Sequence, residues 1–600
     1  MQFLRNQFRK IGFLIGMIAL LAGGSLAGAA GPVAAQGGTT VENAPVADIE
    51  RPFQLPFAEP AGLDTWLMAQ PYGNTTGAYR QRFTTYGASG GIHFGLDLSA
   101  PCGTEVVAVA DGIVFAVDGP FGSPPHNLMI DHPQLGYASM YGHLLQASDW
   151  RPGDVVKQGQ VVALSGDSGE TCYGRPHLHL EFRDLAHITK YNPITLIEAN
   201  WDNLVLLGDT ARDFARDLDE PRKWQSLYDQ PQARTAGPII NDFANPWPLD
   251  WEKGVTPPEE AGLESTMLFT ETEIVPIEPL HRLPVARQLT AGDCCTQFYW
   301  AADSSEIRYI DQPSRNAPLG LWGIDPLQPR TGPQFVTAQL GIYSPDGKWF
   351  AYPDRESGQV VIEPLATGKQ RLLDTKGRNP SFTPDSQSVM WTDYDEDAPR
   401  DTREETIWLA DVDGGQPRSL ISARRVSRVA WLSNDLWLMS RRIAGSSDQE
   451  LFTFSLVDGS QETLIQQLPR FRSVALSPNK RYMVYYVAFE SVAENGVWLY
   501  DLKFPKRAPR KLPFFGTYRW QDDDHLIYVP LEPEATEHNF YQYNLLTRQT
   551  RPLFPTGTGL IIANNEWRIS PDGRQLALLA ADGQKLDGIW VLDLAQNPES

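Results

Sequence analysis

Two short strings carry residues that could bind a metal ion: GGIHFGLDL, which contains His93 and Asp97, and RPHLHLEF, which contains His177 and His179. The second string alternates, so its two histidines and Glu181 would share one face of a β-strand. Imidazole nitrogen and carboxylate oxygen are ordinary zinc ligands, and a catalytic zinc keeps one position open for water. We therefore expect the two strings to meet at a zinc site.

The sequence around these strings predicts a compact all-β domain over residues 55–197. The run EVVAVADGIVFAV (Glu105–Val117) predicts two strands that form a hairpin around Asp111-Gly112, because Asp-Gly favours tight hairpin turns. Further short strands are predicted at Leu128–Asp131, Tyr137–Tyr141 and Val161–Ser165.

The N-terminus has the pattern of a secretory signal over residues 1–35. Three basic residues precede an apolar run at 11–22, and Val33-Ala34-Ala35 fits a cleavage site, with cleavage near Ala30 as an alternative. A retained membrane anchor is the weaker interpretation, because the apolar run is short. We expect a secreted or periplasmic, cell-envelope protein with no membrane span in the mature chain.

The chain of 600 residues is too long for one core, so we expect at least two domains. Loss of the signal would take the formal net charge from −22 to −25, since it removes three basic residues. Such an acidic exported protein is not expected to bind nucleic acid.

Four cysteines lie beyond the predicted signal, and export permits disulfides. Cys102 follows one metal string and Cys172 precedes the other, so a Cys102–Cys172 bridge would staple the site if the strings meet. Cys294 and Cys295 are adjacent. They could form a vicinal disulfide, stay reduced, or be unpaired core residues, and the sequence does not choose among these.

Two segments lack the pattern of a packed domain. Residues 36–54 are rich in small and polar residues and are predicted to be a disordered linker. Residues 198–280 contain many prolines and are predicted to be a connector with some helix, for which Asp209–Asp219 is the candidate.

Residues 281–600 contain a repeat that predicts a β-propeller. Pro and Asp or Gly at the centre of a recurrent four-residue string favour type I turns, and alternating strands follow each turn. Seven turn signals, at 303, 346, 385, 434, 479, 523 and 572, are 39 to 49 residues apart, which is the length of a four-stranded blade. These blades resemble TolB-type and WD-repeat-like propellers. We expect about seven blades, with Met267–Ile277 as a candidate for the strand that closes the ring.

The N-terminal motifs resemble the lysostaphin/LytM-type zinc endopeptidases over about residues 55–197. His93-x-x-x-Asp97, the string YGHL that contains His143, and the string PHLHLEF that contains His177 and His179 occur in the order and spacing of that family. The residues before the last string, CYGR, depart from the commoner Ser-Thr-Gly.

The resemblance implies a role for each of these residues. His93, Asp97 and His179 would be the ligands of a Zn²⁺ ion, and His143 and His177 would be the catalytic pair beside it. A ligand histidine usually donates its second N–H to a carboxylate or carbonyl, for which Glu181 is the candidate. His126 and His132 are predicted to be structural.

The first functional hypothesis is an exported zinc metalloendopeptidase that hydrolyses peptide bonds in peptidoglycan cross-links. A second is a non-catalytic peptidoglycan-binding or regulatory protein, although degenerate relatives of that kind usually lose ligands and this chain has lost none. A third keeps the zinc endopeptidase but gives it secreted proteins as substrates. In each case the propeller would bind a protein or polymer ligand, which is an analogy from fold alone.

Overall fold

The computed structural model describes residues 51–207, 214–237 and 286–594, apart from single residues and short runs inside these ranges. The predicted signal peptide and the first part of the predicted linker lie outside the described residues. Phe53, near the end of that linker, is buried and forms a β-bridge with Ile197. The packed chain therefore begins slightly before residue 55.

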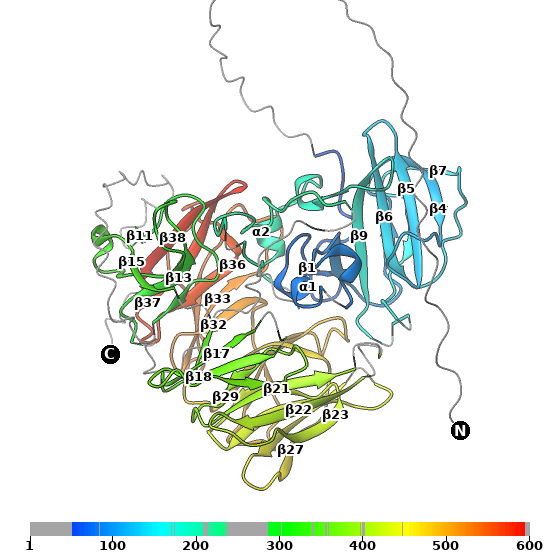
Figure 1. Cartoon of the computed structure of the whole chain (residues 1–600). Coiled ribbons are helices and arrows are strands. Elements are labelled where there is room, and N and C mark those ends of the chain that lie inside the picture. Colours follow the sequence, from blue (N-terminus) through cyan, green and yellow to red (C-terminus); the bar gives the residue numbers. More distant parts are fainter. Residues whose placement is uncertain are drawn as a thin grey trace, which may run out of the picture. The chain divides into compact units, whose positions relative to one another are not determined.

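An eight-stranded antiparallel sheet forms the core of the N-terminal part of the described chain. Its order is β1-β2-β9-β6-β5-β4-β7, and β10 also pairs with β9 (Figure 1). The strands are β1 (Leu67–Gln70), β2 (Leu96–Ser99), β4 (Gly112–Val117), β5 (His126–His132), β6 (Tyr137–Leu144), β7 (Val155–Val156), β9 (His177–Asp184) and β10 (Lys190–Tyr191). A short helix, α1 (Thr76–Arg80), follows β1.

The predicted alternation of the last metal string is confirmed. Leu178, Leu180 and Phe182 of β9 are fully buried in the main apolar cluster of this sheet. His177 and His179 therefore lie on the opposite face, as the period of two requires.

The predicted hairpin at Glu105–Val117 is wrong. β3 (Glu105–Val107) pairs with β8 (Val161–Leu164) in a separate two-stranded sheet, whereas β4 pairs with β5 and β7. Gly112 is required for another reason: a Cβ atom there would lie 2.5 Å from the Asp131 carbonyl oxygen of β5. The Asp-Gly pair thus marks a close approach of two strands instead of a tight turn.

The C-terminal part is a seven-bladed propeller: within residues 286–594, seven antiparallel sheets have four strands each. The first two blades contain β12 (Tyr299–Trp300), β13 (Ile307–Asp311), β14 (Gly320–Ile324), β15 (Gln334–Thr337), β16 (Ile342–Tyr343), β17 (Trp349–Pro353), β18 (Val360–Pro364) and β19 (Arg371–Leu373). The next two contain β20 (Ser381–Phe382), β21 (Ser388–Tyr394), β22 (Glu404–Asp411), β23 (Arg418–Arg424), β24 (Ser427–Trp431), β25 (Leu436–Arg442), β26 (Gln449–Ser455) and β27 (Gln461–Leu468).

The remaining blades complete the ring. They contain β28 (Phe471–Leu476), β29 (Tyr482–Val487), β30 (Gly496–Asp501), β31 (Arg510–Lys511), β32 (Gly516–Trp520), β33 (His525–Pro530), β34 (Tyr541–Asn544), β35 (Thr550–Pro552), β36 (Ile562–Ile569), β37 (Gln575–Asp582), β38 (Lys585–Asp593) and β11 (Ala286–Gln288). The closing contact is the pairing of β11 with β38. The candidate closing strand Met267–Ile277 lies outside the described residues.

The recurrent turns join the first and second strands of the blades. Between β16 and β17, the Gly347 N–H donates to the Ser344 carbonyl, and the Ser344 hydroxyl donates to Asp346 at 2.7 Å. The same serine oxygen accepts from the Trp349 N–H. These side chains therefore provide hydrogen-bond partners within the turn and for the first N–H group of the next strand, which explains why these residue types recur.

The connector is partly described and packs against the residues between β1 and α1. It contains a one-turn helix, α2 (Trp201–Leu204). Of the candidate helix Asp209–Asp219, residues 209–213 and 218 lie outside the described residues. The described remainder is not helical, and Phe214 forms a β-bridge with Thr75 instead. The Gln230 side chain accepts a hydrogen bond from the Asn74 N–H at 2.8 Å.

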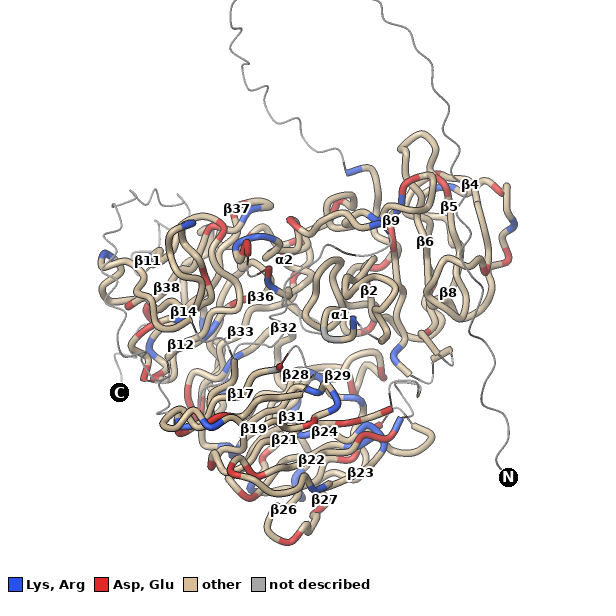
Figure 2. The backbone as a smooth tube through the Cα atoms, viewed as in Figure 1, with Lys and Arg blue, Asp and Glu red and all other residues tan. Residues whose placement is uncertain are grey.

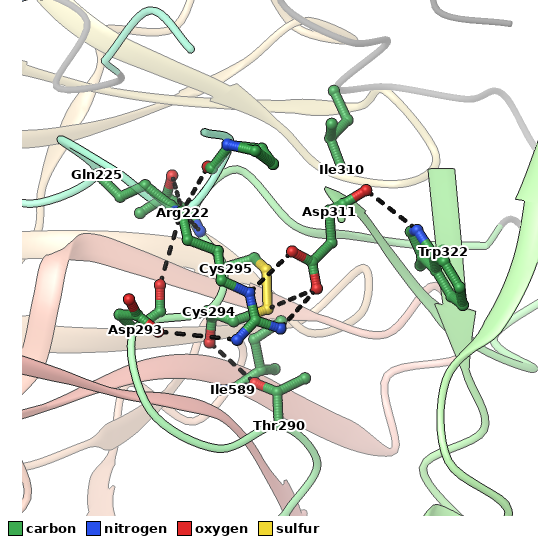
Figure 3. The surroundings of a disulfide bond; sticks show 12 residues. Arg222, Gln225, Thr290, Asp293, Cys294, Cys295, Ile310, Asp311, Trp322 and Ile589 are labelled. Carbon is green, nitrogen blue, oxygen red and sulfur yellow. Dashed lines mark hydrogen bonds and ion pairs between the residues drawn. A yellow bond between two sulfur atoms is a disulfide. The ribbon is translucent and has the colours of Figure 1, made fainter. Parts of the chain in front are cut away.

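Both cysteine pairs are disulfides. Cys102 and Cys172 are bridged with their Cα atoms 5.5 Å apart, which confirms the predicted staple. Cys294 and Cys295 form a vicinal disulfide, one of the alternatives that the sequence left open. Figure 3 shows it beside Asp311, which accepts two hydrogen bonds, from Nε and Nη2 of Arg222, at 2.9 and 2.8 Å.

Basic and acidic residues alternate along the described chain. Figure 2 shows them interspersed along the propeller blades. Among the described residues, no helix has the length and apolar character needed to cross a bilayer.

Candidate metal centre

Three of the predicted ligands converge at the junction of β2 and β9. Asp97 of β2 is paired directly with His179 of β9, and their Oδ1 and Nδ1 atoms are 2.8 Å apart. His93, which precedes β2, brings its Nε2 to 3.2 Å from both of those atoms. Antiparallel register therefore joins residues that are 82 positions apart in the chain.

This set fits a zinc ion. His93 donates Nδ1–H to the Pro71 carbonyl at 2.8 Å, and His179 donates Nε2–H to Glu181 at 3.1 Å. The other nitrogen of each ring faces the Asp97 carboxylate and could offer its lone pair to a metal ion once any proton there is displaced. Tetrahedral ligands at about 2.1 Å from zinc lie about 3.4 Å apart, close to the separations observed here. The second nitrogens have the carbonyl and carboxylate partners that orient ligand histidines.

The cluster is buried, and its groups shift one another's protonation. Burial opposes the charge of Asp97, but the neighbouring His93 and His177 and the hydrogen bonds from His179 hold its pKa well below the ordinary value. Burial likewise opposes the charge of His179, but hydrogen bonds to Asp97 and Glu181 raise its pKa to about 9. Metal binding here would therefore displace a proton.

His143 and His177 lie beside the three ligands. Their ring centroids are 4.8 Å apart, and the His143 ring is 5.7 Å from that of His179. His143 is the last residue but one of β6 and has a left-handed backbone conformation, with φ of 57°. Burial, together with the positive charge of His177 and His179, lowers the pKa of His143 to about 3.

Backbone carbonyls set the tautomer of both rings. His143 donates Nδ1–H to Pro124, and His177 donates Nδ1–H to Arg175 at 2.7 Å. Each ring therefore leaves Nε2 free, and that of His177 lies 4.0 Å from Asp97 Oδ2. Free Nε2 atoms beside a metal are suited to accept and return protons.

The structure thus brings all five predicted site residues into one cluster. The two histidines predicted to be structural lie elsewhere: His132 bonds to the Asp111 carbonyl and the Ser139 hydroxyl, and His126 pairs with Asp118. Glu181 lies where the sequence placed it, against His179.

Sequence reasoning missed three partners of the cluster. Two are the carbonyls of Pro71 and Pro124, which carry no side-chain signal. The third is Arg183, whose guanidinium bonds to Glu181 at 2.7 Å. The sequence did contain a pattern that predicts the position of Arg183, because the alternation of β9 continues to this residue and places it on the same face as the histidines.

The disulfide lies beside a loop that a buried carboxylate organises. Asp167 is 2% exposed and accepts hydrogen bonds from the N–H groups of Gly169, Cys172 and Gly174. This loop leads into β9, so the bridge and the carboxylate together fix the approach to His177.

A second group of potential ligands, Cys294, Cys295 and Asp311, lies in the propeller. Both sulfur atoms are in the vicinal disulfide, so they offer no thiolate. Within the described residues, the β2–β9 junction therefore has the only set with the chemistry of a catalytic metal site.

Comparison with known proteins agrees with this geometry. Residues 91–193 match the model of Peptidase family M23. An uncharacterized metalloprotease from Haemophilus influenzae is 39% identical over 106 residues, which are 17% of this chain and 21% of that protein. The DD-carboxypeptidase/endopeptidase Mpg of Neisseria meningitidis is 36% identical over 92 residues, or 15% of this chain and 20% of the relative.

Lysostaphin from Staphylococcus simulans is 29% identical over 116 residues, which are 19% of this chain and 23% of that protein. The chain thus spans only about a fifth of the length of these relatives. Among solved structures, the lysostaphin catalytic domain covers 22% of this chain and 90% of its own, with 22% identity and a TM-score of 0.18.

An oligogalacturonate lyase structure covers 50% of this chain and 88% of its own, at 10% identity and a TM-score of 0.37. The sequence matches and the local geometry agree with one another. The chain therefore carries, at residues 91–193, a domain of peptidase family M23.

Proposed function

We propose that this protein is an exported zinc metalloendopeptidase that hydrolyses peptide bonds in peptidoglycan cross-links. The observation that carries the proposal is the convergence of His93, Asp97 and His179 with two further histidines whose Nε2 atoms are free. Relatives named lysostaphin and DD-carboxypeptidase/endopeptidase support wall peptide as the substrate class.

A zinc ion bound by the three ligands would polarise a scissile carbonyl and lower the pKa of water in its open position. His93 and His179 are held for that task by their bonds to Pro71 and Glu181. The anionic Asp97 completes the set and leaves the site with net positive charge.

His143 and His177 supply the proton transfers. A backbone carbonyl holds Nδ1–H of each ring, which leaves Nε2 as the nitrogen available for proton transfer. One imidazole takes a proton from the attacking water, and an imidazolium then donates to the leaving amine or to the developing oxyanion. The low pKa of His143 keeps that ring neutral before the reaction begins.

The test is digestion of purified sacculi beside a panel of unfolded proteins. We expect wild-type protein to release wall peptides with new amino termini, and a strong chelator to stop the release until zinc is restored. The His143→Ala variant should keep stoichiometric zinc but lose turnover. His525→Ala, which alters a propeller histidine paired with Asp522, is the matched control. Release of wall peptides at the wild-type rate by chelated protein would refute the proposal, and cleavage of the protein panel alone would assign a different substrate.

A further inference from the structure

A buried ion pair stands next to the metal centre, and the proposed reaction does not use it. Glu181 and Arg183 lie two residues apart on β9, on the face that carries His177 and His179. Both side chains are 5% exposed. A buried ion pair is costly to desolvate, and breaking one partner leaves an uncompensated charge.

Both oxygens of Glu181 are occupied. Oε1 accepts from His179 Nε2 at 3.1 Å, and Oε2 accepts from Arg183 Nε at 2.7 Å. Arg183 thus holds the carboxylate that fixes the tautomer and ring orientation of a metal ligand. On its own, this contact would make Arg183 only a partner of Glu181.

Arg183 has a second contact of a different kind. Its Nη2 also donates to the carbonyl of Phe121 at 2.7 Å. Phe121 belongs to residues 118–125, the loop between β4 and β5, which we call the β4–β5 loop. The same loop supplies both backbone acceptors of His143: the Pro124 carbonyl accepts from Nδ1, and the Ser123 carbonyl accepts from the His143 N–H at 3.0 Å.

The β4–β5 loop also has an independent brace. The Asn127 side chain donates to the carbonyls of Gly119 and Gly122 at 3.0 and 3.1 Å. The loop packs closely on β6, since a Cβ atom on Gly142 would lie 2.2 Å from the Ser123 Cβ. A displacement of the loop would therefore move the acceptor that orients His143.

We propose that Arg183 is a positioning residue that orients two histidines at once. It orients the metal ligand His179 through Glu181, and it orients the catalytic His143 through the β4–β5 loop. The inference rests on the proposed function and deepens it. A guanidinium is suited to this task because its planar fork can serve two acceptors at once. A lysine ammonium could keep the charge beside Glu181, but it lacks the fork that also reaches Phe121.

The Arg183→Lys variant separates these two contacts. We expect its zinc affinity, measured by competition with a chromogenic chelator, to stay within about threefold of wild type, because the carboxylate keeps a cation. We expect kcat to fall by about tenfold or more with KM unchanged, because His143 loses its orientation. Glu181→Gln should show the converse, with zinc affinity lowered by about 10- to 100-fold.

A second variant tests the loop without touching the ion pair. Asn127→Ala removes a different brace of the β4–β5 loop, and it should lower kcat while zinc affinity stays at the wild-type value. The matched control is Arg308→Lys, which alters a largely buried arginine that pairs with Glu306 two residues away on β13 of the propeller. That control should change neither quantity.

Hydrogen exchange gives a readout that does not depend on turnover. In metal-free protein, amides of residues 118–127 and the His143 amide should exchange faster in Arg183→Lys than in wild type, while β2 amides do not change. The inference would be overturned if Arg183→Lys had the same kcat and the same amide exchange rates as the wild type. A kcat loss that saturating zinc restores would also overturn it, because Arg183 would then act only through Glu181. If wild-type protein fails to cleave sacculi, the proposed function fails, while the exchange and zinc data still decide whether Arg183 holds the loop.

Discussion

Removal of the Cys102–Cys172 bridge should destabilise the peptidase sheet by an amount that depends on the length of the loop it closes. The bridge closes a loop across a sequence separation of 70 residues. In the chain-entropy treatment, opening a loop of this size costs about 4 kcal/mol at 25 °C. That loss is a large fraction of the stability of a typical domain.

The assay is hydrogen exchange of full-length protein at increasing denaturant, read at amides of β6 and β9. Amides that exchange only on global opening report the free energy of unfolding of their own unit. A Cys102→Ser/Cys172→Ser variant should lose about 4 kcal/mol at these amides, while amides of β29 in the propeller serve as the internal control. A loss below about 1 kcal/mol would show that the loop is restrained without the bridge, contrary to this prediction.

Two further predictions concern buried positions. Burial raises the pKa of Asp202 to about 7, so its folded state favours the protonated form, and up to about 4 kcal/mol of stability should be lost as the pH rises from about 4 to 7. Asp202→Asn should abolish this dependence of stability on pH, measured by thermal unfolding at several pH values. An unchanged dependence would show that Asp202 is not its cause. A Cβ atom at Gly95 would lie 2.4 Å from the Leu180 carbonyl and 2.9 Å from His179 Nε2. Gly95→Ala should therefore cost about 1–3 kcal/mol and weaken zinc binding, whereas Gly77→Ala, in open space, should do neither.

The side chains of the site could be predicted from sequence, because the spacing of residues along a strand determines which face of the sheet each one lies on. The strict alternation from His177 to Phe182 separates a core face from a ligand face, and the structure confirms the core face. The propeller was readable for a related reason. Its turns need particular residue types, such as the serine and aspartate at 344 and 346. The repeat length of the blades is therefore visible in the sequence.

Interactions of the backbone could not be predicted from the sequence in the same way. Any residue can supply a carbonyl, so the acceptors at Pro71 and Pro124 left no signal, although they fix the tautomers of two histidines. The hairpin at Glu105–Val117 was predicted wrongly because Gly112 serves a close contact between strands and not a turn. The packing of Gln230 on Asn74 joins distant segments, which local pattern does not encode.

We propose above that the β2–β9 cluster binds a metal ion and cleaves peptide bonds in the cell wall. The most direct test is mass spectrometry of sacculi digested by wild-type protein and by the His179→Ala variant. We expect wall peptides with new amino termini from wild type and none from the variant, which should also fail to bind stoichiometric zinc. Equal release of peptides by the two proteins would contradict it.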